Sequence, residues 1–258
     1  MNNILSIDFE SWIHFYKDIL NDKNVAMTSS ERKLLDDDWV LEVLDKILNL
    51  LDQYDQTATF FMVGEIYEWH PEITQKIITK GHEVGYHTHS HLRLNNASVL
   101  QNELLKSKKF IENVKPIGFR APSIFMQKDA MTFLKQSGFR YSSSTYANHK
   151  IHQIDGVDEI PVTTISYRKN NKEKGKFVMP AELTLKMLFT KIPFGSGLFV
   201  SFFGRYMTYV IKWLNKKKGV PAILFIHPWQ LYQPREIKGF KFISFSIIYK
   251  RKGGKQYC

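Results

Sequence analysis

Four short apolar segments of the chain each lead to a side chain that can do chemistry. The segments cover residues 3–7, 82–86, 117–120 and 222–226, and the polar residues that end or follow them are Asp8 and Glu10, His87, Arg120 and His227. In a barrel of parallel strands and helices, the carboxyl ends of the strands meet on one face, and active sites are built there. The chain is therefore predicted to be an α/β protein, a distorted (β/α) barrel of seven or eight units.

Helical and strand patterns alternate along much of the chain. Apolar spacing predicts helices over residues 39–54, 71–80, 98–113, 128–137 and 206–217, and strands over 57–63, 139–142 and 159–162. Residues 240–249 are expected to form a closing strand or a strand-to-helix segment. Asp36, Asp37 and Asp38 precede the first of these helices, where carboxylates favour the positive N-terminal end, so we expect them to cap it. No domain boundary is visible, and barrels of about 250 residues are routinely one domain. A single domain over residues 1–258 is the expectation.

His87 and His91 stand four residues apart in the stretch GHEVGYHTHSHLR, residues 81–93. Residues at this spacing share one face of a helical turn. Both imidazoles could then point at one metal ion, with the remaining ligands supplied from elsewhere in the chain. His89 lies between them; on a strand it would share their face, and on a helix or tight turn it would point away.

Five motifs occur in a fixed order: SIDFES, TFFMVGE, GHEVGYHTHSH, GFRAPS and FIHPW. Together they resemble the ordered motifs of the polysaccharide deacetylase family, also called the NodB-homology or carbohydrate esterase 4 family. The resemblance covers residues 4–227. The first motif is similar to that of an Asp-x-Glu branch associated with bacterial surface-glycan biosynthesis.

The resemblance implies a role for each of these polar residues. Glu10, His87 and His91 correspond to metal ligands, Asp8 to the general base, His227 to the general acid that protonates the departing amine, and Arg120 to the arginine that pairs with the base. Two histidines and one carboxylate leave open positions on a divalent ion, as catalysis requires. Zinc is the expected cofactor, although the same ligands suit iron, cobalt or nickel. The family leaves the position of His89 variable, so we do not count it as a ligand.

The sequence departs from the family pattern in one region. An aspartate and a tryptophan often form a fourth motif, in which the Asp tunes the acid histidine, and residues 143–162 show no clear counterpart; the candidates there are Asp155, Asp158 and Glu159. The same region carries TYANH, where the surface-glycan branch places substrate-facing residues. We therefore predict substrate contacts from Tyr146 and His149, and sugar-stacking faces from Trp12 and Trp229, with Phe15 and Tyr16 beside Trp12. Aromatic residues are equally common as core filler.

The distribution of charge along the chain bears on its possible partners. The chain carries 36 Lys and Arg against 25 Asp and Glu, a net +11, and the excess gathers in residues 168–176, 212–218 and 235–255. Such runs are usually a solvated face, but they could also contact an anionic membrane or a pyrophosphate-linked substrate. Peripheral membrane contact could involve the aromatic residues beside the late lysines: Phe194, Phe199, Phe202 and Phe203 with Lys216, Lys217 and Lys218. No nucleic-acid motif accompanies the charge, so no nucleic-acid partner is expected.

Two further features suggest a compartment. The start MNNILSIDFES lacks the basic and apolar regions of a secretory signal. The one cysteine, Cys258, cannot form an intramolecular disulfide. We expect a cytoplasmic protein, with a possible peripheral place at the inner membrane face.

The motifs predict a metal-dependent hydrolase that removes an N-acetyl group from an amino sugar, in a polysaccharide or in its nucleotide- or lipid-linked precursor. The resemblance places this reaction in O-antigen or capsule-type biosynthesis. One alternative is a deformylase or deacylase of a polyprenyl-phosphate-linked sugar, which the basic late region would suit. Another is a carbohydrate-binding module that has lost activity, although such a module would need neither base nor acid.

Overall fold

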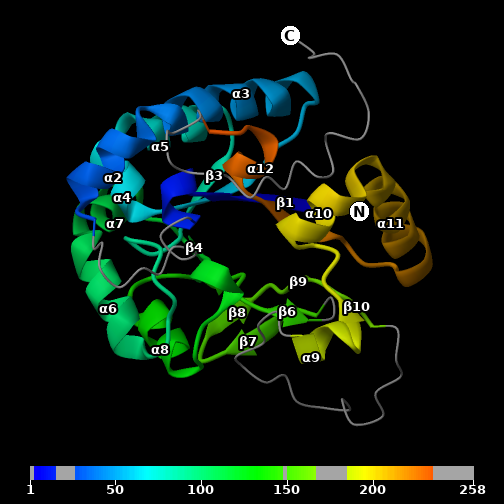
Figure 1. The fold of residues 1–258 in the computed structure, drawn as a ribbon. Helices are drawn as coiled ribbons and strands as arrows, with labels where there is room; N and C mark the ends of the chain where they lie inside the picture. Colours follow the sequence, from blue (N-terminus) through cyan, green and yellow to red (C-terminus); the bar gives the residue numbers. More distant parts are fainter. Residues whose placement is uncertain (1–2, 16–26, 148–149, 167–184, 235–258) are drawn as a thin grey trace.

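A curled sheet of eight strands forms the centre of the protein (Figure 1). The computed structural model describes residues 3–15, 27–147, 150–166 and 185–234, so the closing segment predicted over 240–249 lies outside the described residues. In sheet order the strands are β12 (Ile223–Ile226), β1 (Ile4–Phe9), β2 (Thr59–Met62), β3 (Glu83–Tyr86), β4 (Gly118–Phe119), β5 (Tyr141–Ser142), β8 (Val157–Glu159) and β7 (His152–Ile154).

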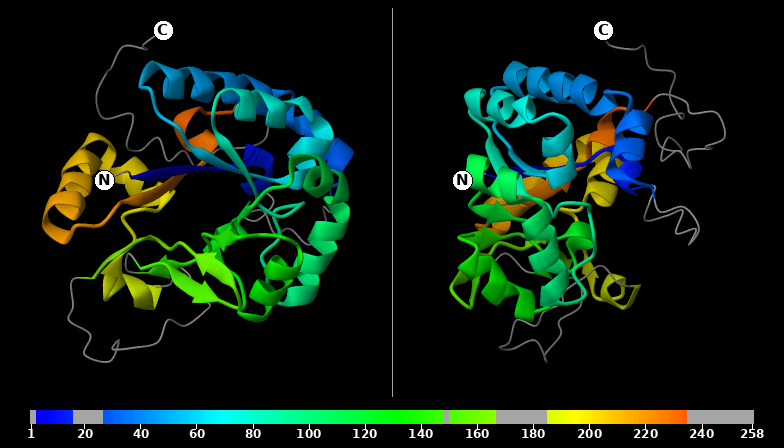
Figure 2. Two further views of the ribbon diagram at one scale, coloured as in Figure 1. Left: turned by 180° about the vertical axis from the view of Figure 1, so that it is seen from behind. Right: turned by 90° about the vertical axis from the view of Figure 1, so that its left-hand side faces the viewer.

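All neighbours in this sheet are parallel except β7, which pairs antiparallel with β8. Most of the helices form an arc outside the sheet, which Figures 1 and 2 show from three sides. The arc contains α2 (Ser29–Asp36), α3 (Trp39–Gln53), α4 (Gly64–Trp69), α5 (Glu72–Thr79), α6 (Ala97–Lys106), α7 (Lys108–Val114) and α8 (Asp129–Gln136). A right-handed strand–helix–strand succession of this kind curls a parallel sheet toward a barrel. The predicted fold class, a distorted (β/α) barrel, is confirmed.

The distortion lies between β12 and the β8–β7 edge. A separate parallel pair, β6 (Tyr146–Ala147) with β9 (Val162–Thr163), occupies this region in place of a regular strand. Backbone bonds join it to β12 through one glycine: Gly195 N–H donates to Thr163 O (2.9 Å), and Phe225 N–H donates to Gly195 O (2.9 Å). A Cβ on Gly195 would stand 2.2 Å from Ile223 O, so only glycine fits this junction.

The remaining elements follow β9. They are the antiparallel pair β10 (Ile165–Ser166) and β11 (Lys191–Ile192), with α9 (Leu185–Leu188), α10 (Gly197–Phe203), α11 (Met207–Trp213) and α12 (Pro228–Leu231). Short helical turns lie at Pro122–Ile124, Gly204–Tyr206 and Leu214–Lys218. No helix in the described part of the chain is both long and apolar enough to cross a bilayer.

Three predicted elements differ from the observed ones. The helix expected over 98–113 is two helices, because Ser107 leaves the helical path and its hydroxyl accepts a bond from Tyr86 Oη (3.0 Å). The single strand expected over 159–162 is the end of β8 and the start of β9, which belong to different sheets. Residues 11–38, for which the apolar spacing predicts no helix, contain α2.

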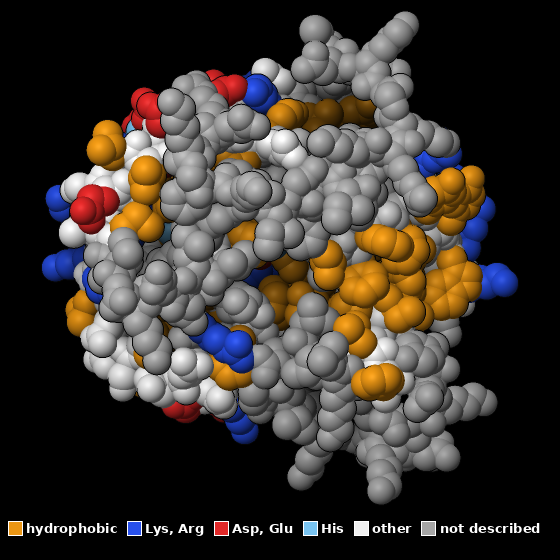
Figure 3. Space-filling view, in the orientation of Figure 1, with side chains coloured by type: hydrophobic (Ala, Val, Ile, Leu, Met, Phe, Trp, Pro, Cys, Tyr) orange, Lys and Arg blue, Asp and Glu red, His pale blue; other side chains and the backbone are white. Residues whose placement is uncertain are grey.

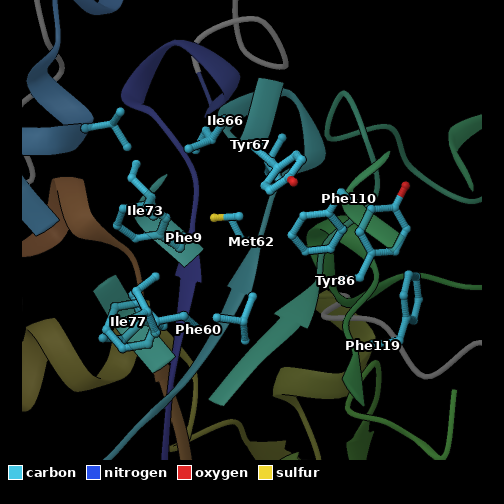
Figure 4. Packing of buried hydrophobic residues seen from close by; sticks show 14 of the residues in the cluster. Phe9, Phe60, Met62, Ile66, Tyr67, Ile73, Ile77, Tyr86, Phe110 and Phe119 are labelled. Atoms are coloured by element: carbon cyan, nitrogen blue, oxygen red, sulfur yellow. The ribbon is translucent and has the colours of Figure 1, made fainter. Parts of the chain in front are cut away.

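The apolar core lies between the sheet and the arc of helices. Figure 4 shows Phe9, Phe60 and Met62 of β1 and β2 facing Ile73 and Ile77 of α5. Side chains alternate along a strand. Ile7 and Phe9 therefore face this core, whereas Ser6 and Asp8 face the concave side of the sheet.

Of the three aspartates expected to cap α3, Asp36 does so. It is buried, and its Oδ2 accepts the Val40 N–H (3.1 Å). Ser11 Oγ donates to its other oxygen, which ties the loop after β1 to the start of α3. Asp38 makes no such bond to the helix, and its Oδ1 lies 3.3 Å from His70 Nε2 instead. The capping expectation is thus correct for Asp36 and wrong for Asp38.

Candidate metal and catalytic site

The segment after β3 turns back on itself without forming a helix. Thr88 (φ 59°) and His91 (φ 55°) both adopt left-handed backbone conformations, which non-glycine residues rarely do. The Thr88 and His89 carbonyls accept the N–H groups of Gly64 (2.8 Å) and Glu65 (2.9 Å) at the start of α4, and these bonds fix the turn. The expectation of a helical turn is therefore wrong, yet the two imidazoles still converge, with 5.1 Å between the ring centroids of His87 and His91.

A buried carboxylate holds the rest of this turn. Glu103 of α6 accepts both the Ser90 N–H (2.7 Å) and the Ser90 hydroxyl (3.0 Å). His89 points to the same side of the turn, where its Nδ1 lies 3.0 Å from Ser107 Oγ. His89 is thus directed away from the other two imidazoles.

Glu10, His87 and His91 form the one group of three potential metal ligands found among the described residues. One donor atom from each lies within 4.8 Å of the others, and all three side chains are buried. Glu10 Oε2 stands 2.9 Å from His91 Nε2 and makes no conventional hydrogen bond within the described part of the chain. The carbonyl of Arg120 accepts the bond from His87 Nδ1 (2.7 Å), which leaves Nε2 to ligate. This donor set fits a divalent cation.

The charges of these ligands also suit a metal. Burial raises the pKa of Glu10, but the neighbouring His91, His227 and His87 outweigh it, and the net pKa lies well below the ordinary value. Burial lowers the pKa of His87 to about 4, although nearby Asp8 opposes this. Glu10 is therefore a carboxylate and His87 a neutral imidazole at neutral pH, which are the protonation states that bind metal ions.

Asp8 and Arg120 form a buried ion pair beside the ligand group. Arg120 Nη1 donates to Asp8 Oδ1 (2.8 Å) and to Ser6 Oγ (2.8 Å). The other guanidinium nitrogens donate to Ser143, Nε to its carbonyl (2.8 Å) and Nη2 to its hydroxyl (2.7 Å). The guanidinium also lies 4.4 Å from the centroid of the Phe61 ring. Arg120 is thus fixed on all sides, and Asp8 Oδ2 is directed toward the site.

His227 reaches the same place from the end of β12. Its Nε2 lies 3.9 Å from Asp8 Oδ2 and 3.7 Å from Glu10 Oε1. Gln230 holds the other side of the residue: its Oε1 accepts the His227 backbone N–H (2.8 Å) and the Nδ1–H (3.0 Å). Because Nδ1 contacts Gln230, Nε2 is the ring nitrogen that faces the two carboxylates.

Gln230 is a residue that the sequence reasoning missed. None of the three acidic residues considered as partners of the acid histidine takes this place. Buried Glu159 accepts bonds from the Ser144 N–H (2.7 Å) and the Thr145 hydroxyl (2.9 Å), whereas Asp155 and Asp158 are exposed. The sequence does contain a local signal for this contact. A Gln at the third position of a helix can bond back to the N-cap residue, as in a capping box, and Gln230 has this position relative to His227.

The residues predicted to contact substrate have different outcomes. Phe15 stacks on Trp229 (4.4 Å between centroids), and Tyr16 lies outside the described residues. Trp229 lies in the site: it stacks on His227 (4.6 Å between centroids), and its Nε1–H donates to Glu10 Oε1 (3.1 Å). Trp12 is 1% exposed within the main core, so the expectation of a sugar-stacking face there is wrong. Tyr146 is buried, and burial together with the charge of Asp8 holds its pKa well above the ordinary value. His149 lies outside the described residues.

The sheet and the grouped side chains define a distorted (β/α) barrel with a candidate metal site at its carboxyl edge. Residues 22–142 match the family model described as polysaccharide deacetylase. A peptidoglycan-N-acetylglucosamine deacetylase of Bacillus cereus is 33% identical over 124 residues, which are 46% of this chain and 55% of that protein. A chitooligosaccharide deacetylase of a Bradyrhizobium species is 28% identical over 98 residues, which are 36% and 45% of the two chains. The resemblance to the polysaccharide deacetylase family that the motifs predicted is confirmed over residues 22–142, which are a little under half of the chain.

The match to these curated relatives spans about half of their length or less. A solved structure from Mycobacterium smegmatis, assigned as a polysaccharide deacetylase, aligns over 88% of this chain and 76% of its own, with a TM-score of 0.56 and 21% identity. This likeness supports the fold.

Proposed function

We propose that the protein is a metal-dependent hydrolase that removes the N-acetyl group of an amino sugar in a polysaccharide or in its precursor. The observation that carries the proposal is the convergence of Glu10, His87 and His91 on one point, with Asp8 and His227 within 4 Å of each other beside it. The deacetylase relatives act, by their names, on peptidoglycan N-acetylglucosamine and on chitooligosaccharide, which supports an N-acetylated sugar as substrate.

A divalent cation held by the three ligands, for which zinc is our proposal, would polarise the acyl carbonyl and make a water molecule more acidic. The protein's own groups then handle the protons. Asp8, oriented by Arg120, accepts the proton of the attacking water. His227, presented through Nε2, gives a proton to the departing amine nitrogen, without which the tetrahedral intermediate returns to amide. Trp229 holds Glu10 through its indole N–H, and its ring stacks on both His227 and Phe15.

Acetate release from N-acetylglucosamine oligosaccharides tests this function. We expect release by the wild type, loss after chelation, and recovery on addition of zinc. Asp8→Asn should retain the metal while activity falls by about 10²–10⁴-fold, the usual contribution of a general base. A protein that binds the metal but releases acetate neither from these oligosaccharides nor from nucleotide-linked N-acetylated sugars would contradict the proposal and would favour the binding-module alternative.

The proposed setting is the synthesis of a bacterial surface polysaccharide of the O-antigen or capsule type, which rests on the motif resemblance. Mass spectrometry of glycan precursors from a strain that lacks the gene tests it, since the undeacetylated precursor should accumulate. A second candidate is deacylation of a polyprenyl-phosphate-linked sugar. It is favoured by the exposed aromatic side chains on α10 and α11, since α10 begins beside Gln230.

A further inference from the structure

The late part of the chain has an unusual charge composition. Residues 183–235 contain no Asp or Glu, but they contain eight Lys and Arg residues. This segment includes α10 and α11. Within it, exposed positive side chains occur at Arg205, Lys212, Lys216 and Lys217.

Large apolar side chains are exposed among these cations. Phe202 is 62% exposed, Tyr206 55% and Tyr209 68%, and Leu198 is also exposed. Figure 3 shows hydrophobic side chains gathered over α10 and α11, with Lys and Arg side chains at the edge of the gathering. We call the exposed side chains of Leu198, Phe202, Tyr206 and Tyr209, with the four cations above, the α10–α11 face. A contiguous apolar surface of this kind on a folded protein marks a binding surface.

Side chains on the inner side of α10 and α11 anchor the α10–α11 face to the rest of the protein. Phe194, Phe199 and Phe203 pack on one another with ring centroids 5.4–6.2 Å apart, and Phe202 contacts Phe203 edge-on at 5.2 Å. On α11 and the turn after it, Met207 and Leu214 are buried. These anchors direct the opposite side of both helices, with Phe202 and Tyr209, outward.

The chemistry of this face selects its partner. Aromatic side chains prefer the boundary between lipid headgroups and acyl chains, and each Lys or Arg near an anionic leaflet adds to the electrostatic attraction. A second copy of the chain docked through the same surface would place cations against cations, because a two-fold contact pairs a patch with itself. An anionic bilayer satisfies both the aromatic and the cationic groups.

We propose that the α10–α11 face binds the surface of an anionic lipid membrane, peripherally and without insertion of a spanning helix. The inference does not depend on the proposed function, but the two sites are adjacent. Gly197, at the start of α10, packs so closely on Gln230 that a Cβ there would stand 2.4 Å from Oε1, the atom that holds His227. Binding through this face would bring the catalytic group close to sugars at the membrane surface.

Co-sedimentation of the full chain with vesicles tests the proposal. We expect retention on vesicles that contain about one third phosphatidylglycerol, little retention on phosphatidylcholine alone, and release at about 1 M NaCl, where the Debye length falls to about 3 Å. Two double variants should each lower the partition coefficient at least about tenfold: Phe202→Ser with Tyr209→Ser, and Lys212→Glu with Lys216→Glu.

The matched control is Leu105→Ser with Lys109→Glu, an exposed apolar and basic pair on α6 and α7, on the other side of the molecule in Figure 1. It should bind vesicles like the wild type. Absence of retention on anionic vesicles, or equal loss in the control, overturns the proposal. A dimer in light scattering that the Phe202→Ser, Tyr209→Ser variant abolishes also overturns it, because the face would then join two chains.

Acetate release from a water-soluble oligosaccharide separates this inference from the proposed function. The face variants should keep that activity and their circular dichroism spectrum while they lose vesicle binding. Vesicle binding without activity would contradict only the proposed hydrolase, and activity without vesicle binding would contradict only the membrane inference.

Discussion

Replacement of Arg120 with methionine tests whether this side chain compensates the buried charge of Asp8. Met fills much of the same volume but carries neither charge nor donors. The change removes four hydrogen bonds of 2.7–2.8 Å, to Asp8, to Ser6 and to two atoms of Ser143. Asp8, only 2% exposed, would then be a buried carboxylate without its cation.

The expected cost follows from this geometry. Loss of one partner of a buried, hydrogen-bonded ion pair destabilises proteins by about 3–5 kcal/mol, because the remaining charge stays desolvated. In a chain near this size each kcal/mol lowers the melting temperature by about 2–4 °C, so Arg120→Met should melt about 6–20 °C lower. Asp8→Asn removes the stranded charge, and the double variant should therefore lose less than the sum of the two single changes, by about 1–3 kcal/mol.

Urea unfolding of the wild type, both single variants and the double variant measures this coupling. A chelator should be present throughout, so that metal binding does not add to the free energy of unfolding. A loss below about 1 kcal/mol in Arg120→Met, or free energies that add within about 0.5 kcal/mol, would refute the claim that Arg120 compensates Asp8.

Three further predictions concern the surroundings of the site. Gln230→Ala should lower kcat by about 10–100-fold, as loss of an orienting partner usually does. Gln230→Glu should move the basic limb of the pH–kcat profile up by about one pH unit, because a carboxylate favours the protonated form of His227. Both are read from steady-state kinetics, and unchanged profiles would contradict the positioning role. Burial raises the pKa of Glu65, but the hydrogen bonds and charges of Arg32 and His14 outweigh it, so the pKa lies well below its ordinary 4.5. The ionised Glu65 therefore stabilises the fold fully above pH 4.5, and this stabilisation is lost as the pH falls through the folded-state pKa. Glu65→Gln should lower the melting temperature at pH 7, and the difference from the wild type should shrink as the pH falls below 4.5. Gly195→Ala should cost about 1–3 kcal/mol in urea unfolding, since its Cβ would meet backbone atoms of two strands.

Some of the site followed directly from strand periodicity and position. The carboxyl ends of parallel strands in a barrel lie at one edge, which places Asp8, Arg120 and His227 in one site without knowledge of the loops. The convergence of His87 and His91 was also predicted, but from a helical turn that the structure does not contain. Their convergence depends on two left-handed residues and on bonds to the start of α4, and a sequence pattern does not show either.

Other features of the fold and of the site could not be predicted, because they depend on contacts between segments that are distant in the sequence. Trp12 is a large aromatic residue in a loop near the site, and only the packing around it shows that it belongs to the core. Ser107 interrupts an otherwise continuous helical pattern at the point where its hydroxyl contacts Tyr86 Oη of β3, which is 21 residues earlier in the chain. The strands β6 and β9 have two residues each, too few for any periodicity.

Elemental analysis of three purified proteins tests the central claim, that Glu10 and two imidazoles hold one cation. We predict about one divalent ion per chain in the wild type, as three protein ligands with open positions imply. His91→Ala should lose the ion, whereas His89→Ala, which changes a nearby buried histidine directed away from the group, should keep it. A wild-type protein without bound metal after incubation with zinc, or a His91→Ala variant with the full complement, would contradict the site.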